Sequence, residues 1–354
     1  MLLGSLLSGV QPLTAHAANS TVWGMDELRS ALPEEAAEYL AGETPESLSG
    51  ETVRHTGGIF ADKLRRQWHE ELRFCLLLLS VVLITSVTSS AGANGKGSKS
   101  VTLAAVASVS AAAVSDVNSY MELARTALQQ LSDYADVLLP TLAAAGSITG
   151  GIGAAAGKCA ATALFMNVLI RLAGAVIFPL ICGYAGLSMA SAAVGNHALD
   201  TAGRLLRSGC TLLLTALAVG FTCWISAVSI VVGSGSEAAS RLTKTALSSA
   251  LPVVGKILSD ASGALSSAAV SIRSTGGIFG LLAVLCICFT PCLRLGLRLL
   301  VYKLTAAVCQ CLCGDTLSGL LGALGDCFAM ELLVIGTAAL ALFVTVYSLM
   351  KAVI

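Results

Sequence analysis

Long runs of apolar residues constrain this chain more than any other feature of its sequence. Three of them, at 74–92, 172–194 and 209–232, contain no charged residue. A helix of about 20 apolar residues crosses the roughly 30 Å hydrocarbon core of a bilayer. Only 12% of all residues are charged and the mean hydropathy is +0.82, which is far from the composition of a soluble domain. The sequence therefore predicts an integral membrane protein.

The remaining apolar segments set the number of spans. A marginal segment at 100–115 is rich in Ala and Ser, which favours packing against protein rather than lipid. Further expected spans are 277–292, a stretch near 295–313, and 331–350. The run 159–170 is one more if Arg171 separates it from the span that follows. We predict an all-α fold: a polytopic helical membrane protein with six to eight spans, two amphipathic interfacial helices and a short N-terminal extracytoplasmic helical segment.

The N-terminal region differs in composition from the rest. Residues 1–17 resemble a signal peptide, with Ala15 and Ala17 in the pattern of a cleavage site, although the usual basic region at the start is missing. A truncated start or a short anchor is the alternative. Residues 18–73 are acidic and then mixed in charge, and we expect them to form the extracytoplasmic segment. The polytopic membrane domain is predicted to cover 74–354.

Basic residues give the expected orientation. Lys96 and Lys99 follow the first span, and basic residues in short loops favour the cytoplasm. Lys63, Arg65 and Arg66 before that span oppose this orientation. We follow the signal peptide and predict an exported N-terminus.

The segment between 233 and 275 mixes polar and apolar residues, and its apolar residues form one helical stripe. The stripe residues recur at alternating steps of four and three, as on one helix face: Leu247, Leu251, Val254, Leu258, Ala261, Leu265, Ala268 and Ile272. Lys256, Ser259 and Asp260 lie off the stripe. Each charge at mid-membrane costs about 2.5–3.5 kcal/mol on insertion scales, so this helix should not span alone in lipid. We expect it to lie on the membrane or pack on the bundle, where it lines an aqueous path, docks another subunit or pads the interface.

Residues 116–140 repeat this pattern. The apolar stripe here comprises Val117, Tyr120, Ala124, Leu128, Leu131, Tyr134 and Leu138, while Glu122, Arg125 and Asp133 lie elsewhere. The same alternatives apply to this second amphipathic helix.

Charged residues in the later spans are further candidates. Arg294 and Arg298 share a helix face, and Lys303 lies about 140° from Arg298. These residues mark either a cytoplasmic turn between two spans, which we favour, or a basic face lining a pathway. Acidic residues that could pair with them follow at Asp315, Asp326 and Glu331.

The segment GGIGAAAGKC, 150–159, does not complete a phosphate-binding loop. Such a loop needs Gly in place of Ile152 and Ser or Thr in place of Cys159, so no NTPase motif is present. Gly153 and Gly157 instead form a G-x-x-x-G motif, which lets helices pack closely.

Other chemistry-bearing residues give no site. The cysteine sets at 286–292 and 309–313 point their C-x-C neighbours to different helix faces, with no His nearby to complete a metal site. The four His are scattered, and no catalytic triad or H-E-x-x-H motif can be argued. Basic and acidic residues balance at 21 each, so no net charge attracts nucleic acid. We expect no enzyme activity, metal or cofactor.

Motifs between 245 and 310 resemble one known family. The stretches PVVGK (252–256), LSDA (258–261) and YKLTAA (302–307) are similar to those of the stage III sporulation protein AE family of endospore-forming bacteria. The resemblance extends over most of the chain. It implies an integral protein of the mother-cell side, in the outer forespore membrane derived from the cell membrane. It also implies membership of an assembly that links mother cell and forespore and resembles secretion systems.

The resemblance also implies partners, and it carries over no catalytic residue. The partners are other stage III sporulation proteins of the same operon, including a cytosolic secretion-type ATPase and ring-forming membrane proteins, the forespore-side channel protein, and membrane lipid. Our first hypothesis is a non-enzymatic membrane subunit of the transenvelope channel, by analogy its permease-like core. The alternatives are a stand-alone small-molecule transporter and a pore-less membrane scaffold.

Overall fold

The computed structural model describes residues 25–39, 50–91, 95–148, 152–195, 198–223 and 254–351, and every regular element within them is helical. The elements are α2 (Met25–Ser30), α3 (Glu34–Tyr39), α4 (Gly50–Ala91), α5 (Gly95–Ile148), α6 (Ile152–Leu172), the π-helical turn η2 (Ala173–Ile177), α7 (Phe178–Val194), the helix Ala198–Cys223, α9 (Val254–Cys313) and α10 (Asp315–Lys351). Six helical stretches in these ranges are long and apolar enough to cross a membrane. The predicted all-α polytopic membrane protein is confirmed.

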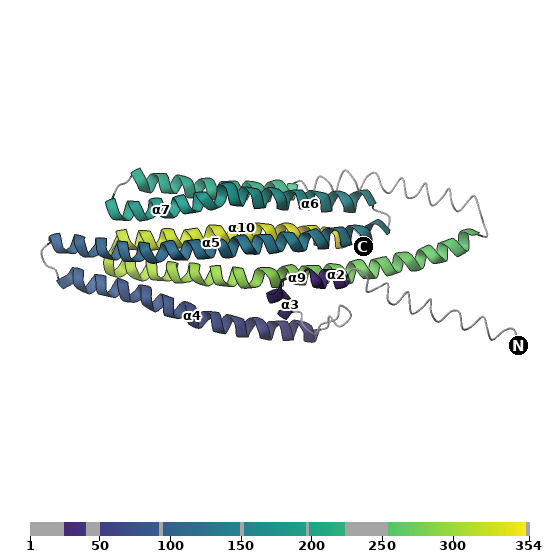
Figure 1. Ribbon diagram of the computed structural model, residues 1–354, viewed down its shortest axis with the longest axis horizontal. Coiled ribbons are helices and arrows are strands. Elements are labelled where there is room, and N and C mark those ends of the chain that lie inside the picture. Colours follow the sequence, from purple (N-terminus) through teal and green to yellow (C-terminus); the bar gives the residue numbers. More distant parts are fainter. Residues whose placement is uncertain are drawn as a thin grey trace.

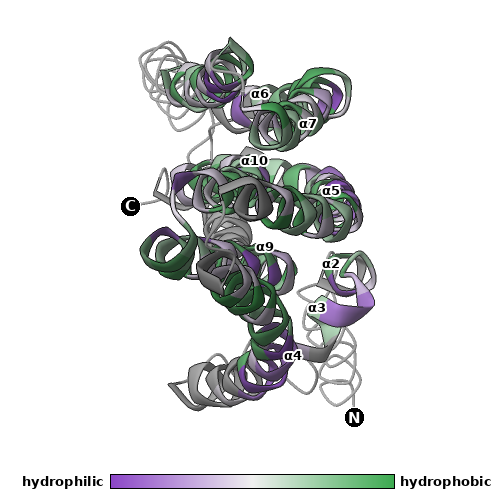
Figure 2. Ribbon diagram, turned by 90° about the vertical axis from the view of Figure 1, so that its left-hand side faces the viewer, coloured by the Kyte–Doolittle hydropathy of each residue, from purple (hydrophilic) through white to green (hydrophobic). Residues whose placement is uncertain are grey.

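The long helices lie side by side in layers (Figures 1 and 2). One outer layer holds α6, α7 and the helix 198–223, the next holds α5 and α10, and then come α9 and finally α4. Consecutive candidate spans run in opposite directions, so the start of α4 and the end of α10 lie at the same end of the bundle. The bundle is therefore an up-and-down arrangement of its described spans.

The α9–α10 hairpin forms the centre of the bundle. In the most apolar stretch of each of these two helices, 56% is buried inside the bundle. The corresponding share in the other four candidate spans is 17 to 33%. Large apolar side chains face outward on the surrounding helices, as at Leu76, Leu164 and Leu212. Because hydrocarbon solvates such side chains as well as protein does, this outer surface suits lipid contact.

Glycines at two turns make the antiparallel packing possible. Gly195 ends α7 with φ +69°, and its N–H donates to the carbonyl of Ser191 at 2.8 Å. Gly314, with φ +81°, is the single residue between α9 and α10. This left-handed conformation is unfavourable for residues with a Cβ, so glycine permits the abrupt reversal of the central hairpin.

Several predicted span boundaries are wrong. The segments 277–292 and 295–313 form one continuous helix within α9, so Arg294 and Arg298 do not mark a turn between two spans. Arg171 does not end a span either, because η2 joins α6 to α7. Pro291 lies inside α9 and Pro140 inside α5, which packed membrane helices tolerate when neighbouring groups satisfy the freed backbone.

The amphipathic segment 116–140 is part of α5, continuous with the marginal segment 100–115. Its whole predicted stripe is buried: Val117, Tyr120, Ala124, Leu128, Leu131, Tyr134 and Leu138. Its apolar face therefore packs on the bundle rather than lying in the membrane interface as a separate helix. The predicted stripe is confirmed, and it packs against protein.

The amphipathic segment 247–272 is likewise not a separate helix. Leu247 and Leu251 lie outside the described residues, and from Val254 onward the backbone is the first part of α9. At 60 residues α9 is about 90 Å long, three times the hydrocarbon thickness. Its first part continues past the ends of α4 and α10 (Figure 1). Whether Lys256, Leu258, Asp260, Leu265 and Ile272 line a pore or dock a partner stays a prediction.

The short N-terminal helices dock on the bundle. Leu28, Ala36 and Tyr39 are buried, and Tyr39 shares a 3.1 Å hydrogen bond with Thr290 of α9. The proposed signal peptide, 1–17, lies outside the described residues, and the extracytoplasmic location of 18–73 stays a prediction.

The central turn yields a test. We expect Gly314→Ala to destabilise the protein by about 1 kcal/mol, because alanine is strained in the left-handed conformation. Gly336→Ala is the control: this glycine lies inside α10 with open space around its Cβ position, and helical alanine is more stable by about 0.5–1 kcal/mol. Thermal unfolding in detergent measures both variants, and equal midpoints would contradict the account of the turn.

Candidate functional site

Arg298 on α9 lies between two carboxylates from other helices. Its guanidinium is 3.2 Å from Glu71 of α4 and 3.7 Å from Asp116 of α5. Tyr120 donates a 2.9 Å hydrogen bond to Glu71, and Tyr302 donates one of the same length to Asp116. The side chains of Arg298, Glu71 and Asp116 are 12%, 5% and 17% exposed, so this Arg298 cluster is nearly closed to solvent.

Aromatic rings complete the environment of the Arg298 guanidinium. It lies over the ring of Phe74 at 3.9 Å and that of Tyr120 at 4.9 Å from the ring centroids. Phe328 of α10 stacks on Tyr302 with a centroid distance of 5.2 Å. A planar, weakly hydrated guanidinium suits such a buried, stacked position better than an ammonium would.

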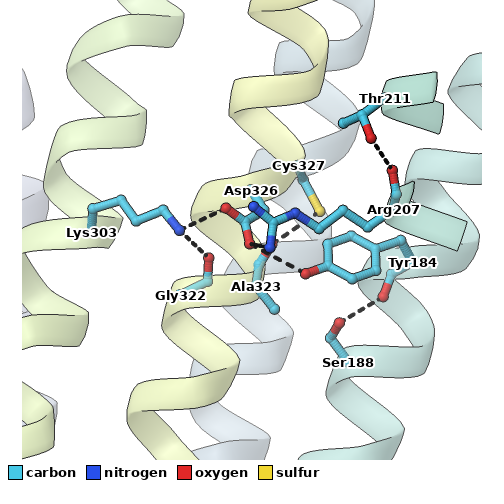
Figure 3. Close-up of polar contacts among 9 residues, drawn as sticks. All are labelled: Tyr184, Ser188, Arg207, Thr211, Lys303, Gly322, Ala323, Asp326 and Cys327. Carbon is cyan, nitrogen blue, oxygen red and sulfur yellow. Dashed lines mark hydrogen bonds and ion pairs between the residues drawn. The ribbon is translucent and has the colours of Figure 1, made fainter. Parts of the chain in front are cut away.

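The second ionic group, the Asp326 cluster, joins α7, the helix 198–223, α9 and α10 (Figure 3). Asp326 lies 2.6 Å from Lys303 and 3.0 Å from Arg207, and Tyr184 donates to it at 3.4 Å. Lys303 also donates to the carbonyl of Gly322 at 3.1 Å. Its aliphatic stem passes close to Gly325, where a Cβ would lie within 3.3 Å of the stem. The missing side chain at Gly325 therefore gives Lys303 room to reach Asp326.

The Asp326 cluster forms the inner end of an open cavity of about 550 Å³. The lining includes Gly195, which is one of the two turn glycines, and Asp315, which follows the other at Gly314. The cavity therefore opens at that end of the bundle. Asp326 lies about 17 Å from Asp315 along α10. Arg207 and Lys303 are 51% and 44% exposed, whereas Asp326 is 11% exposed. The cavity thus presents the two cations, and their shared carboxylate lies behind them.

The charges of the two clusters balance. Three carboxylates, Glu71, Asp116 and Asp326, stand against three cations, Arg207, Arg298 and Lys303. The Arg298 cluster alone has one negative charge in excess, and the Asp326 cluster has one positive charge in excess.

Glu331, five residues after Asp326, is fully buried in α10. Neither of its carboxyl oxygens has a hydrogen-bond partner among the described residues. A carboxyl group without a partner is costly in such a place. The predicted pairing of Glu331 with the basic residues is wrong.

The predicted basic residues separate. Arg298 faces α4 and α5, whereas Lys303 faces α10, as expected from their different directions on the helix. Arg294 borders a small cavity of about 80 Å³ next to α3 and joins neither cluster. Asp326 does pair with Lys303, as anticipated, and Asp315 lines the open cavity instead. The three basic residues therefore do not form one basic face.

Sequence reasoning missed most members of both clusters. Glu71, Asp116 and Arg207 come from three other helices, and no local pattern identifies their partners. A usable signal exists all the same: each is a charged residue within or beside a long apolar helix, where an ion needs a partner.

The G-x-x-x-G residues Gly153 and Gly157 lie in the first part of α6. Just after them, Lys158 donates to Ser348 of α10 at 2.8 Å, and Thr162 shares a 2.6 Å hydrogen bond with Thr345. The helices are thus joined by polar contacts in this region, and the packing role of the glycines themselves stays a prediction.

We expect Arg298→Met to destabilise the protein by about 3–5 kcal/mol, because it leaves Glu71 and Asp116 buried without their cation. Arg204→Met is the matched control. Arg204 is 69% exposed and pairs with Asp200 on the same helix, a contact worth at most about 0.5 kcal/mol. Thermal unfolding in detergent compares the two, and a similar small loss in both would show that the Arg298 cluster is not a stabilising contact.

Comparisons with known proteins identify one family. One curated relative, the stage III sporulation protein AE of Bacillus subtilis (strain 168), is 29% identical over 197 residues. The alignment covers 54% of this chain and 48% of that protein, so the chain matches about half the length of its curated relative. No solved structure matches the chain. The sequence pattern that defines the stage III sporulation protein AE family matches residues 39–352. The chain therefore belongs to the stage III sporulation protein AE family, a family of sporulation membrane proteins.

Proposed function

We propose that this chain is a non-enzymatic membrane subunit of a transenvelope channel between mother cell and forespore, required for forespore development. The family match over 39–352 is the observation that carries the proposal. The protein acts in the outer forespore membrane, on the mother-cell side. Its partners are the other stage III sporulation proteins of the same operon, among them a secretion-type ATPase and ring-forming membrane proteins, and the forespore-side channel protein.

The architecture supports a role as the permease-like core of such a channel. A bundle with an apolar outer surface and ionic clusters inside it is suited to hold a polar path within a membrane. The first part of α9 continues beyond the bundle at the end where α4 begins and α10 ends. With an exported N-terminus, that part of α9 extends into the space between the two forespore membranes, where its stripe meets the channel partners.

One observation favours the alternative of a stand-alone small-molecule transporter. The open cavity at Asp326 has a volume within the range of small-ligand sites, about 300–1,000 Å³. Uptake of solutes into liposomes that contain only this purified protein would support that alternative. A pore-less scaffold would assemble with the same partners and would show no solvent-accessible path along α5 or α9 when single cysteines are labelled.

The stripe at the start of α9 gives the direct test of the channel proposal. We expect Val254→Asp or Leu258→Asp to abolish co-purification of the partners from sporulating cells and the formation of heat-resistant spores, because a charge on an apolar docking face opposes burial. Ser259→Asp adds the same charge off the stripe and should leave both readouts within about twofold of the unmodified protein. Normal spores and an intact complex in Val254→Asp and Leu258→Asp would contradict the proposal.

A further inference from the structure

The cavity that ends at Asp326 has an excess of positive charge at its inner end. Its lining contains three cations and three carboxylates: Arg204, Arg207, Lys303, Asp200, Asp315 and Asp326. Asp200 is already paired with Arg204 on one helix. Asp315 lies at the cavity opening, about 17 Å along α10 from Asp326. At the inner end, two cations therefore share one carboxylate.

Both cations line the cavity and have more donors than their contacts with Asp326 and Gly322 use. Arg207 contacts Asp326 through Nη1, and a guanidinium carries five N–H donors. Lys303 directs its ammonium to Asp326 and to the carbonyl of Gly322, which leaves one of three donors. Each side chain is about half exposed, and both line the cavity. In a cleft with an excess of positive charge, unused donors favour an anion.

The walls suit a compact oxyanion. Tyr184, Ser188 and Ser191 of α7 line one side, and Thr316 lies near the opening. Guanidinium and ammonium groups recognise phosphate and carboxylate through charge-assisted hydrogen bonds. The inner end holds only one carboxylate, so it is a poor site for a metal cation.

We propose that this cavity binds the oxyanion head of a small phosphate- or carboxylate-bearing ligand between Arg207 and Lys303. Asp326 acts there as an internal anion: it holds the two cations in place when the site is empty and competes with the incoming ligand. The ligand is either a free oxyanion from solution or the headgroup of an anionic phospholipid. The site does not depend on the proposed channel role, since it rests on the cavity and its charges.

The test uses the full chain in detergent at constant ionic strength, with inorganic phosphate as the first probe. Binding is measured by calorimetry and by the rise of the thermal midpoint. We expect Arg207→Gln to weaken binding at least about tenfold, since it removes charged hydrogen bonds at the inner end. Arg125→Gln is the control, because Arg125 is 46% exposed, pairs with Glu122 on α5 and does not line the cavity, and it should change binding by less than about threefold.

Asp326→Asn provides the sharper variant, because it removes the internal competitor. We expect it to bind phosphate several-fold more tightly than the unmodified protein, provided that it elutes as the same species from a sizing column. Weaker binding in this variant would overturn the role given to Asp326. Equal effects of Arg125→Gln and Arg207→Gln would overturn the site itself.

A second probe separates the two sources of the ligand. The protein is placed in nanodiscs of phosphatidylcholine with or without phosphatidylglycerol, and retained lipid is identified by native mass spectrometry. Retention of phosphatidylglycerol that is lost in Arg207→Gln but kept in Arg125→Gln assigns the site to a lipid headgroup. Phosphate binding without such retention assigns it to a free oxyanion. Failure of both probes to bind the unmodified protein refutes the proposal.

Discussion

Charged side chains inside a bundle of membrane-length helices require partners, and this requirement organises the centre of the molecule. Arg298 lies about 23 Å from the end of α9, too far for its side chain to reach the end of the helix. Its guanidinium instead meets one carboxylate from α4 and one from α5. Since a buried carboxylate without a cation would destabilise the bundle, these contacts favour one register and rotation of the three helices relative to one another.

The two ionic clusters differ in their access to solvent, and this difference bears on function. The Arg298 cluster is enclosed by aromatic rings and is best understood as a structural joint of α4, α5 and α9. The Asp326 cluster joins the outer layer to the α9–α10 hairpin, yet its two cations face an open cavity. Contacts made in the cavity can therefore alter the balance of charge that holds the outer layer to the centre.

The sequence indicated the fold class well because span length and apolar periodicity are local properties. The stripe from Val117 to Leu138 could be assigned from its spacing alone, and it is buried throughout. Helix continuity was harder to predict, because the charges at Arg294 and Arg298 suggested a turn that the backbone does not make. The chain actually reverses direction at Gly314, the single residue between α9 and α10, which adopts a positive φ that glycine tolerates.

Partners in the ionic clusters could not be read from the sequence. Glu71 and Arg298 are 227 residues apart, and only the packing of three helices brings them together. Lys303 and Asp326 were easier because they flank one tight turn, so their positions along the hairpin roughly coincide. For the first part of α9, the residue spacing predicts an apolar stripe but does not identify the surface that packs on it.

A double-mutant cycle between Glu71 and Arg298 tests the central claim most directly. Thermal unfolding in detergent would be compared for the unmodified protein, Glu71→Gln, Arg298→Met and the double variant. The account predicts a coupling energy of about 1–3 kcal/mol, because the double variant loses the pair without leaving Glu71 charged and alone. Strictly additive effects would contradict it, since they would mean that the two residues do not interact within the folded bundle.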